Sequence, residues 1–373
     1  MLRINRRLWR NFDWITLLIV ILISVIGILT IYSTTRQPYG APQAPFYLKQ
    51  FLWLGIGLAG LIFIVSFDYI WLSRFSIPLY VAGLALLIIV MLIGKTGMGA
   101  QRWISLGPVS FQPSEFFKLI FIVMLAHSLS ISQDLIGLKS FLRISFFIVV
   151  LPFLLILKQP DLGTALVLLA LFFLIMLARG IQRKALIVIL SVSIVSLPFL
   201  GSIVWSGLKE YQKNRVIAFV DADVDPSGIG YHIKQSKIAI GSGELIGKGF
   251  LKGTQGPFRF LPEKHTDFIF AAFAEEWGFL GSALLLSLYF IFILRGLDTS
   301  RKAKDDFGKI LALGITFMFS LYFFINIGMT LGIMPVVGIP MPFMSYGGTA
   351  LLSNFIAAGI LINIRTRRFS LFY

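Results

Sequence analysis

Ten long apolar blocks recur along this chain and leave few folds open to it. They cover about residues 14–32, 51–67, 77–93, 111–129, 144–157, 162–177, 185–205, 267–294, 310–331 and 350–364. A helix needs about 20 mostly apolar residues to cross a bilayer. Hydrophobic residues make up 57% of the chain and charged residues 13%, an imbalance that one soluble core cannot hide. The pattern predicts an all-α polytopic membrane protein with about ten transmembrane helices.

Two details of the blocks bear on topology. The fifth and sixth are short and joined by only four residues, 158–161, so they could form a re-entrant hairpin instead of two spans. Either arrangement leaves both termini on the same side. The first block is too long for a signal-peptide core and lacks a small-residue cleavage site after it. We therefore expect it to stay as an anchor in a single membrane domain over residues 1–373.

The placement of Lys and Arg predicts the orientation. Eighteen lie in the termini and in the connections on one side of the predicted bundle, whereas the opposite short connections hold five, Arg36, Lys49, Lys95, Arg102 and Lys158. Positively charged connections are retained in the cytoplasm during insertion. Both termini are therefore predicted to be cytoplasmic. The net charge of +16 is mostly this topology signal, and we expect no nucleic-acid partner.

Residues 206–266 form the one long connection, predicted to be a large extracytoplasmic loop between helices 7 and 8. Structureless loops longer than roughly 12–15 residues are usually functional or disordered. This one carries several aromatic residues among its charges, and residues 215–220 could lie as a short interfacial helix. We expect a lid packed on the outer membrane face.

Metal and thiol chemistry find little support. The chain has no Cys, which excludes disulfides and thiol catalysis. Its three histidines, His127, His232 and His265, are far apart in the sequence. We therefore predict no zinc site made by protein side chains alone.

Ionisable residues inside an apolar block are costly and so mark candidate sites. Glu115 and Lys118 stand three residues apart in the fourth block, which puts them on one face of a helix that Pro113 is suited to begin. They could simply neutralise each other. Alternatively, Glu115 holds Lys118 in place to contact a phosphate group.

Asp267 opens the eighth block, directly after the segment 261–266. A carboxylate there complements a helix N-terminus, which is a sufficient structural explanation. Its place between a long polar loop and lipid also favours a raised proton affinity and a catalytic role. On a continuous helix, Glu275 and Glu276 would lie roughly 12 Å deeper. We expect them to pair with a neighbouring helix, or to line a polar cavity.

Three further segments are candidates. Asp161 follows a proline, and both residues suit a helix start. Residues 338–348 are uncharged and rich in Pro and Gly, and such irregular backbone is tolerated at membrane depth only inside protein or along a cavity. Residues 241–249, GSGELIGKG, fail both nucleotide-binding fingerprints. Their amides could still surround a diphosphate with the help of nearby cations, or form only a flexible turn; the cations are Lys248, Lys252 and Arg259.

Three motifs in this order resemble the SEDS family (shape, elongation, division and sporulation). They are QPDLGT at 159–164, LPEKHTDFIF at 261–270 and PFMSYGG at 342–348. The resemblance extends over essentially the whole chain. Residues 247–255, GKGFLKGTQ, are similar to the elongation branch of the family rather than its division branch, although Glu244 stands where a glycine is expected.

The resemblance implies a peptidoglycan glycosyltransferase of the bacterial cytoplasmic (inner) membrane that polymerises lipid II for cell-wall elongation and rod shape. It implies a class B penicillin-binding protein as cross-linking partner, beside other elongation-complex membrane proteins. In the family, the aspartate that matches Asp267 is essential, and the residues that match Glu115 and Lys118 form a functional pair. Arg102, Asp161 and Ser345 are carried over as further substrate-binding candidates.

In this chemistry a sugar hydroxyl attacks an anomeric carbon and expels undecaprenyl diphosphate with inversion. Because the diphosphate leaves as an anion, one base suffices, whereas a glycosidase needs two carboxylates. We expect Asp267 to accept the hydroxyl proton. Lys118 and Arg102, or a divalent cation such as Mg²⁺ or Mn²⁺, would offset the diphosphate charge.

Two other functions stay open on the sequence. A lipid II flippase would require access from both faces of the membrane, and no internal repeat typical of such transporters is visible. A scaffold for the elongation machinery would tolerate replacement of Asp267 by Asn.

Overall fold

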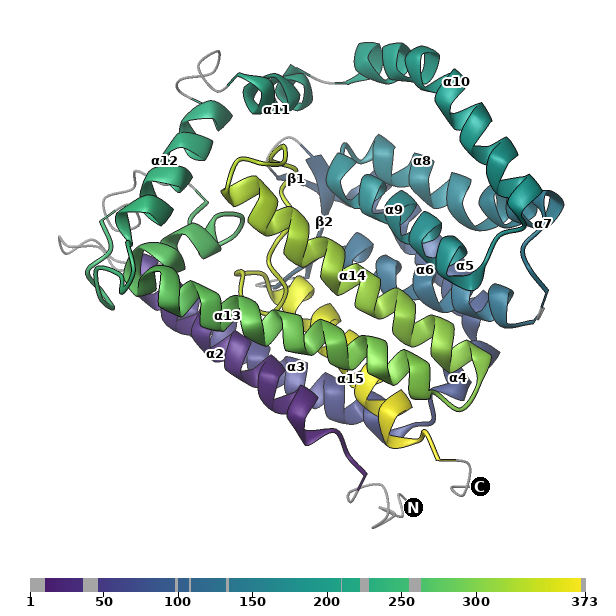
Figure 1. Cartoon of the computed structure of the whole chain (residues 1–373), viewed down its shortest axis with the longest axis horizontal. Helices are drawn as coiled ribbons and strands as arrows, with labels where there is room; N and C mark the ends of the chain where they lie inside the picture. Colours follow the sequence, from purple (N-terminus) through teal and green to yellow (C-terminus); the bar gives the residue numbers. More distant parts are fainter. Residues whose placement is uncertain are drawn as a thin grey trace.

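The computed structural model describes residues 11–35, 46–97, 100–106, 109–131, 134–208, 210–221, 228–254 and 263–369. Within these ranges the chain is a bundle of long helices with one small antiparallel sheet (Figure 1). Nine of the described helices are long and apolar enough to cross a membrane. The predicted all-α polytopic fold is confirmed.

The nine candidate spans reproduce nine of the ten predicted blocks. They are α2 (Trp14–Thr35), α3 (Phe46–Ser66), α5 (Ser76–Ile93), α6 (Pro113–Ser130), the continuous unit of α7 (Leu138–Ile144), η1 (Ser145–Val150) and α8 (Leu151–Lys158), α9 (Leu162–Arg179), α13 (Ile269–Lys302), α14 (Asp306–Thr330) and α15 (Gly348–Thr366). The fifth and sixth spans have 21 and 18 residues, lengths that suit two full crossings better than a re-entrant hairpin. The seventh block corresponds to α10 (Arg183–Gly207), which is not among the nine, so the count of ten stays a prediction.

The spans pack through small residues and present large apolar ones outward. On α2, Ser24 and Gly27 are buried, whereas Leu18 and Leu29 are 58% and 43% exposed. A Cβ at Gly27 would lie 2.5 Å from the backbone oxygen of Met344, so only glycine lets these two segments approach so closely. Membrane helices associate in this way because lipid already satisfies their large apolar side chains.

The irregular segment predicted at 338–348 lies inside the bundle. Phe343 is 1% exposed and its ring packs against Phe319 of α14, Phe292 of α13 and Phe355 of α15, with ring centroids 5.2 to 5.6 Å apart. The Tyr289 hydroxyl of α13 donates a hydrogen bond to the backbone oxygen of Pro342, the residue before Phe343. This non-helical backbone is therefore enclosed by protein, as expected.

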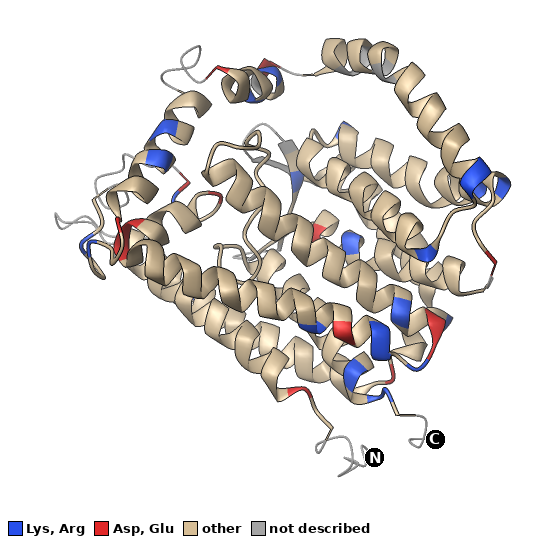
Figure 2. Ribbon diagram, in the orientation of Figure 1, with Lys and Arg blue, Asp and Glu red and all other residues tan. Residues whose placement is uncertain are grey.

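An ion-pair network marks the end of the bundle that carries the termini. Asp13, just before α2, pairs with Arg295 near the end of α13 and, at 3.3 Å, with Arg365 near the end of α15. Arg365 also pairs with Asp298 at 2.8 Å. Figure 2 shows Lys and Arg gathered at this end of the helices. This end, called the termini end below, is the one that the charge count predicts to be cytoplasmic.

A short helix, α4 (Ile70–Arg74), precedes α5 in the chain, and a small sheet follows α5 and connects it to α6. Its strands β1 (Lys95–Gly97), β2 (Ala100–Leu106) and β3 (Val109–Phe111) pair antiparallel in chain order. The Thr349 hydroxyl of α15 donates to the backbone oxygen of Ser110 at 3.0 Å and ties β3 to the bundle. The sheet was not predicted, and it is what positions Arg102 on β2.

Two helices make up about half of the described part of residues 206–266. α11 (Glu210–Val220) covers the predicted interfacial helix, and α12 (Ile229–Ser242) packs on the bundle. The Ser236 hydroxyl of α12 donates to the backbone oxygen of Thr330 at the end of α14, at 2.7 Å. Figure 1 shows α10, α11 and α12 arching around one side of the bundle. The extracytoplasmic location of this segment and its role as a lid stay predictions.

Candidate active site

A kink divides α13. At Gly278 the backbone has φ 63° and ψ −161°, values that essentially only glycine adopts. Residues 269–277, called the half-helix below, are thereby separated from the longer part, residues 279–302. The loop 244–249 satisfies the freed backbone groups. The amides of Lys248 and Gly249 donate to the oxygens of Glu275 and Glu276, and the amides of Phe279 and Leu280 donate to the oxygens of Glu244 and Leu245, at 2.8 to 3.0 Å.

The glycines of this loop allow close approach to the half-helix. A Cβ at Gly243 would lie 2.1 Å from the backbone oxygen of Ala274, and one at Gly247 would lie 2.1 Å from that of Glu276. The amides of residues 247–249 are all engaged by backbone oxygens of the protein. These three amides are therefore not available to a diphosphate in this arrangement: those of Lys248 and Gly249 bind backbone oxygens of the half-helix, and that of Gly247 binds the backbone oxygen of Gly243. Arg259, the third cation proposed for that diphosphate, lies outside the described residues.

Glu275 and Glu276 reinforce the same junction. Glu275 Oε1 accepts hydrogen bonds from Lys248 Nζ at 2.6 Å and from the amide and hydroxyl of Thr254 at 2.8 and 2.7 Å. Glu276 accepts one from the hydroxyl of Ser33, close to the end of α2 that lies away from the termini. The expected pairing with a neighbouring helix holds for Glu276. The kink at Gly278 comes after both residues, so the half-helix that carries them is continuous, and the loop 244–249 packs against it at their level.

Asp267 stands two residues before the half-helix and is half-buried. The Asn326 side-chain amide of α14 holds the backbone of Asp267 in place. It donates hydrogen bonds to the backbone oxygens of Asp267 and Ile339 at 3.1 and 2.8 Å. Burial raises the pKa of Asp267 to about 6, with Glu263 acting in the same direction and Arg215 and Arg102 opposing. The carboxylate is therefore held near the point where it can gain or lose a proton at physiological pH.

Arg215 of α11 reaches the same place as Asp267. A Cβ at Gly338 would lie 3.5 Å from both Asp267 Oδ2 and Arg215 Nη1, and the φ of +73° at Gly338 favours glycine. Sequence reasoning missed this role, since residues 215–220 suggested only an interfacial helix. The available signal was an arginine at the head of an otherwise apolar stretch.

Asp161 and Arg102 form a second charged pair. Asp161 Oδ1 caps α9 by accepting from the amide of Thr164 at 3.2 Å, which confirms the predicted helix start. The other carboxylate oxygen of Asp161, Oδ2, lies 3.4 Å from Arg102 Nη1 and accepts a 3.4 Å hydrogen bond from the side-chain Nε2 of Gln112. Because Arg102 also acts electrostatically on Asp267, it links the two carboxylates.

Glu115 and Lys118 form the predicted pair in α6, with Nζ and Oε1 2.8 Å apart. Lys118 is 1% exposed. Its ammonium also donates to the hydroxyl of Tyr322 on α14 and lies 4.3 Å from the centre of that ring. Both readings of the pair stay open, but Tyr322 is a partner that the sequence did not suggest.

Ser345 braces the backbone that leads to Asp267. Its hydroxyl donates to the oxygen of Thr266 at 2.7 Å and accepts from the amide of Met341 at 2.8 Å. The next amide, that of Tyr346, donates to the oxygen of His265 at 2.8 Å. The substrate contact of Ser345 stays a prediction. In this structure its hydroxyl makes hydrogen bonds to the protein backbone.

The described residues offer no group of three His, Cys, Asp or Glu side chains that could hold a metal ion. Mg²⁺ is often held by one or two carboxylates together with substrate phosphates. Such an ion would fit beside Asp267 only when a diphosphate completed its ligands. The requirement for a divalent cation stays a prediction.

Known proteins are similar to this chain in both sequence and fold. The family model described as Cell cycle protein, FtsW/RodA/SpoVE, matches residues 11–369. The chain belongs to this family. Peptidoglycan glycosyltransferase RodA of Treponema pallidum (strain Nichols) is 34% identical over 426 residues, a match that covers 96% of this chain and 98% of that protein. Peptidoglycan glycosyltransferase MrdB of Escherichia coli (strain K12) is 38% identical over 359 residues, covering 96% and 94%.

A solved structure agrees with this membership in FtsW/RodA/SpoVE. A chain from the work described as "Structural coordination of polymerization and crosslinking by a peptidoglycan synthase complex" superposes with a TM-score of 0.79 at 28% identity, covering 96% of this chain and 99% of that one. The resemblance to the SEDS family is therefore confirmed over nearly the whole length. Its three motifs contribute Asp161, Asp267 and Ser345: Ser345 binds the backbone just before Asp267, and Arg102 interacts with both carboxylates.

Proposed function

We propose that this FtsW/RodA/SpoVE protein is a peptidoglycan glycosyltransferase that polymerises lipid II for cell-wall elongation, with Asp267 as its catalytic base. The names of the RodA and MrdB relatives support the enzyme class. The observation that carries the assignment of the site is the half-buried Asp267 carboxylate, which has Arg215 and Arg102 near it and a pKa of about 6.

The reaction follows from this protonation state. At pH 7 a carboxyl group with a pKa of about 6 is mostly ionised, so it can accept a proton. Asp267 takes the proton of the acceptor sugar's C4 hydroxyl while that oxygen bonds to the donor's anomeric carbon. The bond to the diphosphate oxygen breaks, and the lipid diphosphate leaves with both electrons. A positioned base of this kind contributes roughly 10²–10⁴ in rate.

The cations have separate tasks in this proposal. Arg102 and Arg215 lie close enough to Asp267 to lower its pKa, and they offset the charge of the leaving diphosphate. Asp161 orients Arg102. Lys118 contacts phosphate only after it leaves the Tyr322 hydroxyl, because the ammonium is now enclosed by Tyr322 and Glu115.

The setting of the enzyme is part of the proposal. The nine candidate spans make it a multi-pass membrane protein. We place it in the bacterial cytoplasmic membrane, with a class B penicillin-binding protein as cross-linking partner and other elongation-complex proteins nearby. The description of the matched solved structure, which joins polymerisation with cross-linking, supports such a partner.

The test replaces Asp267 by Asn and measures glycan polymer formed from purified lipid II by the folded, membrane-inserted protein. The assay is run with and without the penicillin-binding protein and with chelator. Asp134→Asn, at an exposed position in the α6–α7 connection, is the matched control. Loss of polymer in Asp267→Asn alone supports the proposal. Unchanged polymerisation would refute the base role and favour a scaffold, whereas headgroup movement across vesicles without any polymer would favour a flippase.

A further inference from the structure

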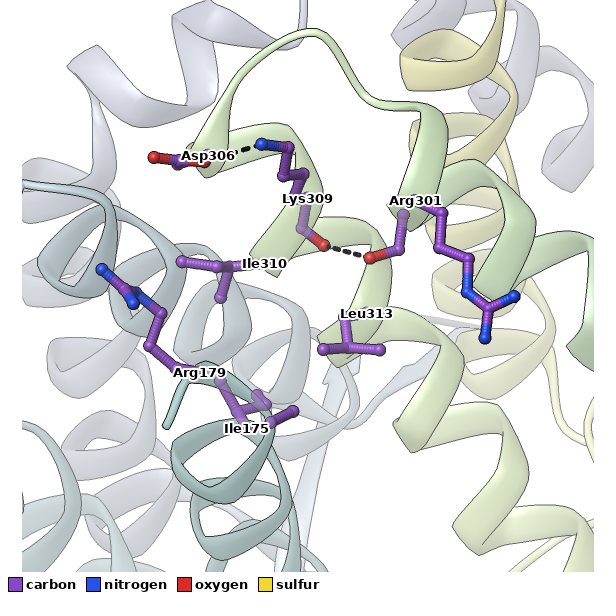
Figure 3. Close-up of a pocket in the computed structure, with 9 residues that line it drawn as sticks. Ile175, Arg179, Arg301, Asp306, Lys309, Ile310 and Leu313 are labelled. Atoms are coloured by element: carbon purple, nitrogen blue, oxygen red, sulfur yellow. Dashed lines mark hydrogen bonds and ion pairs between the residues drawn. The ribbon is translucent and has the colours of Figure 1, made fainter. Parts of the chain in front are cut away.

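A hollow of about 430 Å³ lies at the termini end of the bundle, between the last turn of α9, the end of α13 and the first turns of α14 (Figure 3). This volume is within the roughly 300–1,000 Å³ typical of small-ligand sites. Its lining comprises Ile175, Ala178, Arg179, Ser300, Arg301, Asp306, Lys309, Ile310 and Leu313. None of these residues belongs to the candidate active site, so the hollow is separate from it.

The lining has an apolar part and a cationic part. Ile175 and Ile310 are buried and Leu313 is half-buried, and all three face the hollow. Figure 3 shows the Arg179 side chain extending past Ile310 on one side of the hollow, with Lys309 beside Asp306 across from it. The guanidinium of Arg301 points away from Arg179 in the same view. The hollow is therefore lined by two cationic side chains, Arg179 and Lys309, next to an apolar surface.

The face of α9 opposite the residues that line the hollow is suited to contact lipid. Leu166, Phe173 and Leu177 of α9 are 48%, 40% and 53% exposed. Their spacing puts them on one face of the helix, which ends at Arg179. The hollow therefore lies at the end of a helix whose other face is suited to lipid hydrocarbon.

We propose that this pocket binds the phosphate headgroup of an anionic phospholipid from the leaflet at the termini end, with Arg179 and Lys309 contacting the phosphate. Basic pockets between helices at the cytoplasmic face recognise such headgroups, and the guanidinium fork of Arg179 matches phosphate oxygens. The ion pair of Lys309 with Asp306 is 2.9 Å long but about half exposed on both sides. Such a surface pair is weak, so Lys309 can turn from Asp306 to a phosphate.

The test titrates the full-length purified protein with phosphatidylglycerol, phosphatidylcholine and inorganic phosphate, and follows bound ligand by native mass spectrometry. Arg179→Gln/Lys309→Gln should weaken phosphatidylglycerol binding about tenfold to thirtyfold. Arg143→Gln/Lys139→Gln removes the same two charges from exposed positions of α7 and should change binding less than about twofold. Ala178→Phe fills the hollow without changing charge and should also abolish the preference for phosphatidylglycerol.

Equal losses in the two charge variants would overturn the proposal, because binding would then depend on general surface charge. Inorganic phosphate that binds as tightly as phosphatidylglycerol would overturn the lipid assignment, and so would equal binding of phosphatidylcholine. These readouts do not depend on polymerase activity, so the proposal stands or falls separately from the role of Asp267.

Discussion

Lys248 and Glu275 form a 2.6 Å ion pair that joins the loop 244–249 to the half-helix at residues 269–277. The carboxylate is 1% exposed and the lysine 29% exposed. Because Asp267 stands just before the half-helix, the loop sets the position of the proposed catalytic base. The residues that hold this junction can be tested apart from the base itself.

Loss of Lys248 should destabilise the protein more than loss of the charge on Glu275. Lys248→Met removes the cation beside a buried carboxylate, and breaking a fully buried pair in this way costs about 3–5 kcal/mol, less where one partner is partly exposed. Glu275→Gln leaves a lysine that can turn to water. We expect a lower Tm in detergent for Lys248→Met, with partial recovery in the double variant. The same Tm for both single variants would contradict this account.

Gly278→Ala should disrupt the kink. The new Cβ would lie 2.3 Å from the amide nitrogen of Gly247, at a φ of 63° that alanine rarely adopts. Such strain costs about 1–3 kcal/mol before the steric clash is counted. We expect a lower Tm and loss of polymerisation. Gly55→Ala is the control, because a Cβ there meets nothing within 4 Å, and it should behave like the wild type.

The rate of polymerisation should depend on the ionisation of Asp267. A base with a pKa of about 6 is inactive when protonated, so the rate should rise with pH through about 6 and level off above it. Arg215 lowers the pKa of Asp267, so Arg215→Gln should move the midpoint to higher pH. Single-turnover rates across this range provide the measurement. A midpoint that Arg215→Gln leaves unchanged would separate the pH dependence from Asp267.

The pair in α6 allows its two interpretations to be separated. Glu115→Gln should lower Tm, because the buried ammonium of Lys118 loses its counter-charge. Glu115→Gln/Lys118→Met should recover much of that stability, since no unpaired charge is left. If Lys118 contacts phosphate, the double variant folds but polymerises poorly. Wild-type polymerisation by a stable double variant would make the pair purely structural.

Tyr322→Phe tests the third member of this cluster. It removes the hydroxyl that accepts a hydrogen bond from Lys118 while keeping the ring. A buried donor left without its acceptor costs about 1–3 kcal/mol. We expect a lower Tm but, because Lys118 no longer has to leave this hydroxyl to reach a phosphate, no increase in the KM for lipid II. A markedly higher KM would instead place Tyr322 in substrate binding.

Much of the architecture was open to sequence analysis because it depends on local properties. Each candidate span matches an apolar block, and α10 covers the block at 185–205. Asp161 caps a helix as its neighbours predict, and Glu115 meets Lys118 because a helix puts residues three apart on one face. Asp267 was identified from its motif and its place at the start of a block. Hydropathy, capping and short helical spacing need no knowledge of distant segments.

The tertiary structure alone decided how these pieces meet. The block predicted at 267–294 extends across Gly278, so hydropathy predicted one span and gave no sign of a kink whose backbone partners come from the loop 244–249. The convergence of Arg215 with Asp267, and of Tyr322 with Lys118, joins helices far apart in the chain. A carboxylate's pKa depends on everything packed around it. The sequence thus specified the membrane helices and the candidate acid, while long-range packing set that acid's charge, partners and orientation.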